Sequence, residues 1–305
     1  MKKHGIPVTV LLIFSLLTAS LPAAATGSAP IAENLEISTY RGVSVGGRLS
    51  AVDPESDPIT FEISTDPVKG SIDLDEDGHF VYTPENGKRG KDYFGYRAVD
   101  SEGNRSQEAT VIIRIEKQKS KVTYSDLSGD SSAYAAVRLA EEGLFTGECL
   151  AGAYVFAPDT PVTRAEFLAM CMKITGHDAE STDCSTGFSD DADIDTWAKP
   201  YVSEALRCGI ISGYETSELG ASFDPDRSIS VAEAAVMLDR AALLTDAVAA
   251  WFSTDDAVPA WAIQAAANVS ACNLMPAGCS FAEDCLTRGE AAELLSNAMD
   301  LINRR

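Results

Sequence analysis

The chain has 305 residues and carries 46 acidic residues against 24 basic ones, which gives a net charge of −22. This length allows two or three small domains. Binding to a phosphate backbone needs clustered Lys and Arg, so the composition argues against nucleic acid as a partner. We interpret the acidity as a solvated, self-repelling surface, with binding of divalent cations as the minority alternative.

The N-terminus has the pattern of an export signal. A basic start at residues 2–4 precedes an apolar run at 8–17, which is too short to cross a bilayer, and small residues offer cleavage after Ala25. Residues 1–25 are therefore predicted to be a signal peptide. No second long apolar stretch follows, so we expect no membrane span after cleavage. If the exported protein stays on its cell, binding must hold it there.

Residues 30–117 show the two-residue periodicity of β-strands. Turn signals at Asp77-Gly78 and Glu102-Gly103 separate the alternating runs. Several short strands within one module predict an antiparallel, immunoglobulin-like β-sandwich. The alternating apolar residues are Ile59, Phe61, Ile63, Ile72, Leu74, Phe80, Tyr82, Phe94, Tyr96, Val111, Ile113 and Ile115.

The sequence motifs of this module are similar to those of a known family. Ala-Val-Asp-Pro-Glu-Ser-Asp-Pro-Ile-Thr-Phe at 51–61, Gly-His-Phe-Val-Tyr-Thr-Pro at 78–84 and Asp-Tyr-Phe-Gly-Tyr at 92–96 resemble the bacterial immunoglobulin-like, cadherin-like surface repeat. The resemblance implies a spacer or an adhesive unit with a protein or glycan ligand.

The resemblance also raises the question of calcium, which some related modules bind through Asp-rich loops. Asp53, Glu55, Asp57 and Asp100 are the candidate oxygen ligands. The alternative is that these acids cap turns and solvate the loop ends, and the sequence alone does not place the four carboxylates around one point.

After a polar joint at 118–123, where we expect two separately folding halves to meet, the chain repeats itself. The predicted units are 124–187, 188–251 and 252–305, with first residues at offsets of 188−124 = 64 and 252−188 = 64. Each unit has an amphipathic stretch, a loop with an aromatic residue and a second apolar stretch. Two helices per unit at this period predict a mainly α-helical array whose units bury their apolar faces against one another.

Each second helix begins with a capping-box pattern, in which a Ser or Thr hydroxyl and a Glu three residues later each bind a backbone N–H group. We assign these residues a structural role. The pairs are Thr163 and Glu166, Ser230 and Glu233, and Thr287 and Glu290.

Two arginines directly follow the caps. Arg164 and Arg288 stand in the first turn, where a cation opposes the helix dipole. Beside free N–H groups they would bind a carboxylate or phosphate, and the alternative is a surface salt bridge. Trp197 and Trp261 begin the first helices of their units and either pack or stack on a sugar ring.

The motifs of the repeat region are similar to those of the S-layer homology domain. Phe-Ser-Asp at 188–190, Trp-Ala at 197–198, Gly-Ile-Ile-Ser-Gly-Tyr at 209–214, Phe-Asp-Pro at 223–225 and Thr-Arg-Ala-Glu at 163–166 carry the resemblance. It implies three such domains in a pseudo-threefold unit that binds secondary cell-wall polysaccharide, anionic and often pyruvylated, in grooves between copies. The contacts it implies are Arg164, Arg288, Trp197, Trp261, Gly213 and Tyr214.

The units also depart from the family pattern. Ser131 stands where the other units have Trp, Val231 where they have Arg, and Ala277 where Gly is usual. We therefore expect fewer than three working grooves.

All seven cysteines lie in the repeat region, and the odd count leaves at least one unpaired within the chain. Cys279 and Cys285 flank one short loop and are predicted to form a local disulfide. The set has no Cys-x-x-Cys pair, and His177 is the only histidine near it, so the spacing argues against zinc.

We therefore expect a non-catalytic bacterial cell-surface protein that its repeats anchor to wall polysaccharide and that displays the N-terminal module. The alternative is an adhesin or S-layer subunit in which that module makes the main contact. An enzyme is disfavoured because the two recognisable parts fill the mature chain, and its histidines, His79 and His177, form no catalytic motif.

Overall fold

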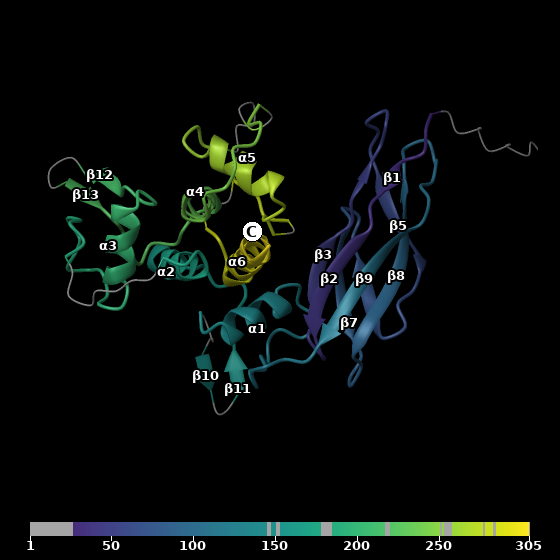
Figure 1. The fold of residues 1–305 in the computed structure, drawn as a ribbon, viewed down its shortest axis with the longest axis horizontal. Coiled ribbons are helices and arrows are strands. Elements are labelled where there is room, and N and C mark those ends of the chain that lie inside the picture. Colours follow the sequence, from purple (N-terminus) through teal and green to yellow (C-terminus); the bar gives the residue numbers. More distant parts are fainter. Residues whose placement is uncertain are drawn as a thin grey trace, which may run out of the picture.

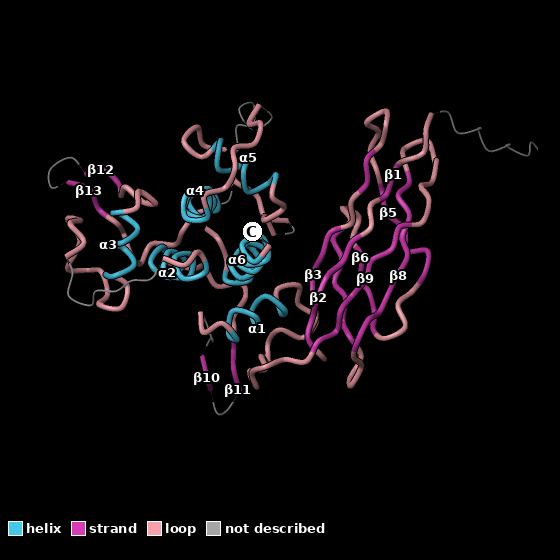
Figure 2. Tube along the Cα trace, viewed as in Figure 1, coloured by secondary structure: helices cyan, strands magenta, loops and turns pink. Residues whose placement is uncertain are grey.

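The computed structural model describes residues 27–144, 148–150, 153–177, 185–216, 220–250, 252, 258–276, 278–282 and 285–304. The predicted signal peptide lies outside these residues. Strands gather in one half of the molecule and helices in the other, where two small hairpins accompany them (Figure 2). Within the described part of the chain, we find no helix with the length and apolar character that a membrane crossing requires.

The N-terminal half is a β-sandwich. One sheet has the strand order β2-β9-β8-β5 and the other the order β3-β7-β6, while β1 pairs with β4. β2 runs parallel to β9, and the remaining pairs are antiparallel. The strands are β1 (Ile31–Ala32), β2 (Leu35–Tyr40), β3 (Val45–Arg48), β4 (Ala51–Val52), β5 (Thr60–Thr65), β6 (Gly70–Leu74), β7 (His79–Pro84), β8 (Gly90–Val99) and β9 (Ala109–Glu116).

The core of the sandwich follows from the alternation in the sequence. In β9, Val111, Ile113 and Ile115 point inward and are buried. From the facing sheet Phe80 packs edge-on against Phe94 with ring centroids 5.2 Å apart. The predicted strand pattern is thus confirmed, except that Ile59 precedes β5, which begins at Thr60.

The C-terminal half contains paired helices. The helices are α1 (Ala133–Glu141), α2 (Arg164–Ile174), α3 (Lys199–Arg207), α4 (Val231–Ala242), α5 (Ile263–Ala271) and α6 (Arg288–Asn303). Figure 1 shows α2, α4 and α6 around a common centre, with α1, α3 and α5 outside them. The hairpin strands are β10 (Glu148–Leu150) with β11 (Ala153–Val155), and β12 (Tyr214–Thr216) with β13 (Gly220–Ser222).

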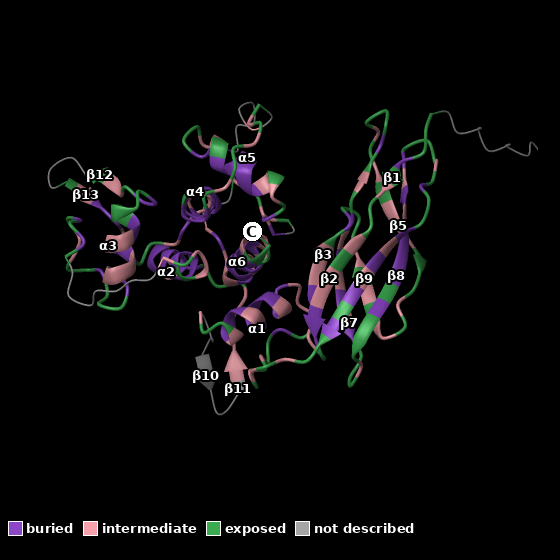
Figure 3. Cartoon of the chain, viewed as in Figure 1, coloured by how far each residue is buried: buried purple, intermediate pink, exposed green. Residues whose placement is uncertain are grey.

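The outer helices pack on central helices in a closed order. α3 packs on α2 and α5 packs on α4, while α1 packs on α6, the last helix of the chain. Each outer helix thus covers the central helix of another unit. A large apolar core extends through all three units, and a smaller second cluster lies between α4 and α5. Figure 3 shows buried residues along α2, α4 and α6, whereas α3 has mostly intermediate and exposed ones.

Backbone hydrogen bonds at the centre connect the three units in a ring. Val162 N–H donates to Leu286 O at 2.9 Å, Leu286 N–H to Ile229 O at 2.8 Å, and Ile229 N–H to Val162 O at 3.0 Å. Each residue directly precedes the N-cap of a central helix. These buried bonds form a ring that joins α2, α4 and α6 at their N-termini.

The sandwich packs against α1. Gly46 N–H donates to Ser131 O at 3.0 Å, and Tyr134 N–H donates to Ser44 O at 3.1 Å. A Cβ atom on Gly46 would lie 2.8 Å from the Ser131 Cβ, so the close approach of the sandwich to the segment before α1 requires glycine at position 46.

The joint between the two halves is fixed by hydrogen bonds to Glu141. Ser120 N–H donates to Glu141 Oε1 at 2.8 Å, and Lys119 N–H contacts the same oxygen. The other oxygen of Glu141 accepts Tyr40 O–H at 2.9 Å. The polar composition of the joint gave no sign of these bonds.

Candidate functional site

The capping boxes are present at all three central helices. At Thr163 and Glu166 the hydroxyl accepts the Glu166 N–H at 3.2 Å, and the carboxylate accepts the Thr163 N–H at 3.0 Å. The pairs Ser230–Glu233 and Thr287–Glu290 have the same geometry. The structure therefore satisfies the cap and N3 N–H groups from within each helix.

The next N–H groups are also occupied, which corrects the prediction of free donors beside the arginines. Arg164 N–H and Ala165 N–H donate to Arg227 O at 2.9 Å and Pro225 O at 3.0 Å. At α6 the first two N–H groups donate in the same way to Thr160 O at 2.8 Å and to Pro158 O at 2.9 Å. Loops of the neighbouring unit thus cover these helix ends, so no backbone anion site remains there.

Arg164 lies inside a cluster at the junction of the first and second units. Its side chain is 7% exposed, its Nε–H donates to Phe223 O at 2.9 Å, and its Nη1 lies 3.7 Å from Glu233 Oε1. Its guanidinium carbon lies 4.8 Å from the Tyr214 ring centroid, and that of Arg227 lies 4.9 Å from the same centroid. The burial of Arg164 excludes the surface salt bridge considered from the sequence.

Glu233 connects the members of this cluster. Its Oε2 accepts the cap N–H of Ser230 at 3.1 Å, while Oε1 accepts Arg227 Nη2 at 2.7 Å and also contacts Tyr214 O–H. Although burial opposes ionisation, the hydrogen bonds from Tyr214 and Arg227 hold the pKa of Glu233 below its ordinary value. Burial and the bond to Glu233 raise the pKa of Tyr214 to about 12, so the phenol stays neutral at physiological pH.

Arg227 is a site residue that the sequence reasoning missed. Its side chain is 41% exposed, so it presents a cation to solvent beside Tyr214. An arginine three residues before the cap Ser230 was the available signal. Gly213, by contrast, is required for packing, because its φ is +75° and a Cβ would lie 2.4 Å from Phe188 Cε1 and 2.6 Å from Ser222 O.

The junction of the third and first units is arranged differently. Arg288 Nη1–H donates to Phe156 O at 3.1 Å, as Arg164 does to Phe223 O. Arg288 lines a small pocket of about 10 Å³, enough for about one water molecule. Tyr124 is near Arg288, and its hydroxyl is buried with no hydrogen-bond partner. The pocket is lined by Leu139, Phe156, Val162, Glu166, Met170, Arg288 and Ala292.

The second helix of the second unit begins with an apolar residue instead. Val231 is fully buried in the common core, and Phe281 of the third unit packs against the same core. At the junction of the second and third units, an apolar side chain therefore fills the position that an arginine holds in the other two units. Ala277 lies outside the described residues.

Both tryptophans lie on the surface. Trp197 is 49% exposed and Trp261 is 59% exposed, while the alanine that follows each is buried. The Trp197 Nε1–H donates to Asp195 Oδ2 at 3.0 Å, which fixes the ring at the start of α3. The two alanines therefore pack in the core, and about half of each tryptophan is exposed to solvent.

The candidate calcium ligands lie at the turns of the sandwich. Asp53 Oδ1 accepts the N–H groups of Glu55 and Asp57, both at 2.9 Å, and Asp100 Oδ1 caps its own turn in the same way. Burial and neighbouring carboxylates raise the pKa of Asp57, and Asp53 Oδ2 is buried with no hydrogen-bond partner. Turn capping is therefore present, and calcium binding stays a prediction.

The predicted disulfide is absent. Cys285 carries a free thiol, and Cys279 packs against the helical core, so the Cys279–Cys285 bridge is not formed. A short loop between two cysteines does not fix the Cα separation and Cβ directions that a disulfide needs.

Two family models match the chain. Residues 22–117 match the bacterial cadherin-like domain, and residues 187–235 match the S-layer homology domain. The chain contains both kinds of domain. The second match includes Trp197, Tyr214, Arg227 and Glu233, and an S-layer homology domain implies a bacterial cell-surface location. Both domains are of non-catalytic kinds.

Solved structures give weaker likenesses. A mutant of the SrpA adhesin from Streptococcus sanguinis is 20% identical over 38% of this chain and 78% of its own, with a TM-score of 0.25. A putative alpha-galactosidase from Bacteroides fragilis is 15% identical over 30% of this chain, with a TM-score of 0.24, and the match spans only 18% of that structure. Scores this low carry no argument about function. Among curated proteins, none matches this chain.

Proposed function

We propose that this is a non-catalytic surface protein that attaches non-covalently to an anionic or pyruvylated wall polysaccharide and displays its cadherin-like domain. In this proposal, residues 1–25 are removed on export and the units 124–187, 188–251 and 252–305 are three S-layer homology repeats. The closed order of helix packing and the ring through Val162, Ile229 and Leu286 support three equivalent units.

The observation that carries the proposal is the cluster at the junction of the first two units. The matched domain supplies Tyr214, Arg227 and Glu233, and the preceding unit completes the cluster with Arg164. Arg164 and Glu233 both contact Tyr214. The guanidinium of Arg227 bonds Glu233 and the carbonyl oxygen of the next residue but is 41% exposed, so its solvent-facing side can bind a carboxylate of the sugar. Trp197 adds an exposed ring on the same unit.

A pull-down with isolated wall sacculi tests this proposal. The full exported chain should bind sacculi and lose binding after the secondary polysaccharide is extracted. Arg227→Ala should weaken binding by about 1.5–3 kcal/mol, or roughly tenfold or more. Arg105→Ala is the control, because it removes another exposed, glutamate-paired cation from the sandwich, where the side chain is 58% exposed. Equal binding of Arg227→Ala and Arg105→Ala would contradict the proposed site.

The alternative is an adhesin or S-layer subunit in which the cadherin-like domain makes the main contact. Ile31 and Val52 favour this reading, because they pair across β1 and β4 and are 65% and 58% exposed. Replacing both with Ser should leave sacculus binding unchanged. If the domain is adhesive through this face, the same change should reduce adhesion to cells that lack the polysaccharide.

A further inference from the structure

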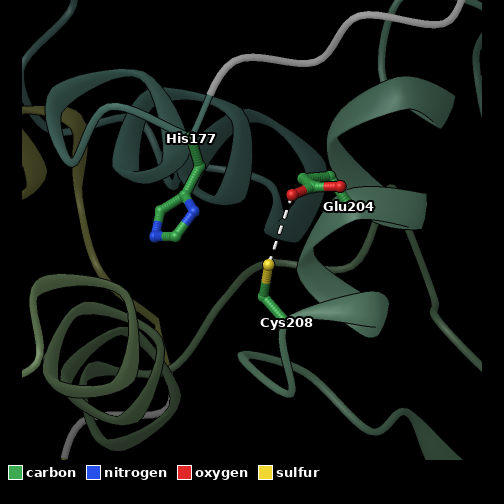
Figure 4. A group of neighbouring side chains, drawn as sticks. All are labelled: His177, Glu204 and Cys208. Carbon is green, nitrogen blue, oxygen red and sulfur yellow. Dashed lines mark hydrogen bonds between the residues drawn. The ribbon is translucent and has the colours of Figure 1, made fainter.

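Away from this cluster, the described residues contain one group of three metal-binding side chains. The ligand atoms of His177, Glu204 and Cys208 all lie within 4.8 Å of one another. Figure 4 shows the imidazole, the carboxylate and the thiol around a common space between the end of α2 and α3.

The backbone holds these side chains in place. Glu204 and Cys208 lie one turn apart on α3, and the Cys208 N–H donates to Glu204 O at 2.9 Å. His177 follows α2 and is fixed by its own N–H, which donates to Met172 O at 3.0 Å. Because α3 packs on α2, two helix ends from different units present all three ligands.

A hydrogen bond at the ring nitrogen away from Glu204 and Cys208 orients the histidine ring. Its Nε2 lies 3.3 Å from Ala241 O of α4, and a carbonyl oxygen can only accept, so Nε2 carries the hydrogen. The lone pair then resides on Nδ1, and Figure 4 shows one ring nitrogen turned toward Glu204 and Cys208. A metal-binding histidine usually has this outer hydrogen bond to a carbonyl or carboxylate.

The thiol and the carboxylate already interact. Cys208 S–H donates to Glu204 Oε1 at 3.2 Å. Arg207 contacts both carboxylate oxygens, with Nε–H donating to Oε2 at 2.8 Å. Its side chain is 72% exposed, so it can leave Oε1 and keep Oε2.

We propose that His177, Glu204 and Cys208 bind one Zn²⁺ ion. One nitrogen, one oxygen and one sulfur ligand suit this borderline-soft cation, and water completes a tetrahedral site. Zn²⁺ takes the place of the thiol proton: the Cys208 thiolate forms the metal–sulfur bond, and the proton passes to water. With metal–ligand bonds of about 2.0–2.3 Å, the ligands must approach one another to roughly 3.5 Å. The bound ion would link the first unit to the second.

Metal titrations of the reduced, metal-free full chain test the site. We expect one Zn²⁺ per chain by calorimetry, and a sulfur-to-cobalt charge-transfer band when Co²⁺ replaces it. Cys208→Ser should abolish the band, and Cys208→Ser and His177→Gln should each lower Zn²⁺ affinity roughly tenfold or more. Saturating Zn²⁺ should raise the Tm of the parent but not of these variants.

Cys272→Ser is the matched control. Cys272 is the C-cap of α5, as Cys208 is of α3, but Asn268 stands one turn before it in place of a glutamate. This variant should keep the band and the affinity. The absence of a band in the parent, or equal bands in Cys208→Ser and Cys272→Ser with unchanged circular dichroism, would overturn the proposal. Recovery of Cys208 from the secreted protein as a disulfide would overturn it too.

Discussion

At the scale of single residues, burial decides what the two first-turn arginines do. Arg164 is almost fully enclosed and bonded to Phe223 O, and burial lowers its pKa. Arg288 is less enclosed and lines a pocket. From the sequence we expected both cations to oppose the helix dipole. The buried contacts of Arg164 instead indicate that this side chain stabilises the fold.

Arg164→Ala should destabilise the fold by about 2–4 kcal/mol, because it removes a buried charge-assisted hydrogen bond and leaves Glu233 with one cation fewer. Chemical denaturation measures the change. Arg227→Ala, at the exposed edge of the same cluster, should cost less than about 1 kcal/mol. A loss for Arg164→Ala as small as the one expected for Arg227→Ala would mean that Arg164 is not a structural residue.

Glu293 should make stability depend on pH. Burial raises its pKa from 4.5 to about 7, although Ser131 O–H donates to its Oε1 at 2.7 Å. Below pH 4.5 the carboxyl is protonated in both the folded and unfolded states, so it has no effect. The free energy of unfolding then falls as pH rises, and above pH 7 the full loss is up to about 3 kcal/mol.

Glu293→Gln should therefore raise the Tm at pH 8 and leave it unchanged at pH 4. Thermal unfolding at the two pH values measures this difference. Glu76→Gln, on an exposed turn of the sandwich, is the control and should change neither. A Glu293→Gln protein with the parent's Tm at pH 8 would show that the carboxyl is solvated.

At the scale of elements, the β12–β13 hairpin depends on Gly213. An alanine there would have both a positive φ and a Cβ overlapping Phe188 and Ser222. Gly213→Ala should cost about 3 kcal/mol, the sum of a left-handed conformation and a steric overlap. Gly209→Ala keeps the conformational cost but meets open space, so it should cost only about 1–2 kcal/mol in the same denaturation experiment.

Some of these elements could be predicted because their rules are local. The alternation of Val111, Ile113 and Ile115 gives one buried face of a strand, and each capping box depends on residues three positions apart. The site could not be predicted in the same way. Arg164 meets Tyr214 and Glu233 only after two units pack together, and no spacing within one unit encodes that contact.

At the scale of the whole molecule, the two halves share an interface. The joint at 118–123, where we expected two separately folding halves to meet, is bonded to Glu141. Glu141→Ala should release it and increase the rate of limited proteolysis there several-fold, because cleavage follows local opening. Glu142→Ala changes an exposed neighbour and should leave the rate unchanged. Rapid cleavage of the parent at this joint would restore the view of two separately folding halves.

The backbone ring through Val162, Ile229 and Leu286 also bears on how the helical half can fail. In an open solenoid each unit touches only its neighbours, so the ends fray and the array melts in stages. Here α1 lies on α6, so within the described residues the first and third units pack on each other and neither has an open end. Loss of any one unit removes two junctions at once. The helical half should therefore unfold in a single all-or-none transition. Partly unfolded molecules that keep one or two working units should not accumulate.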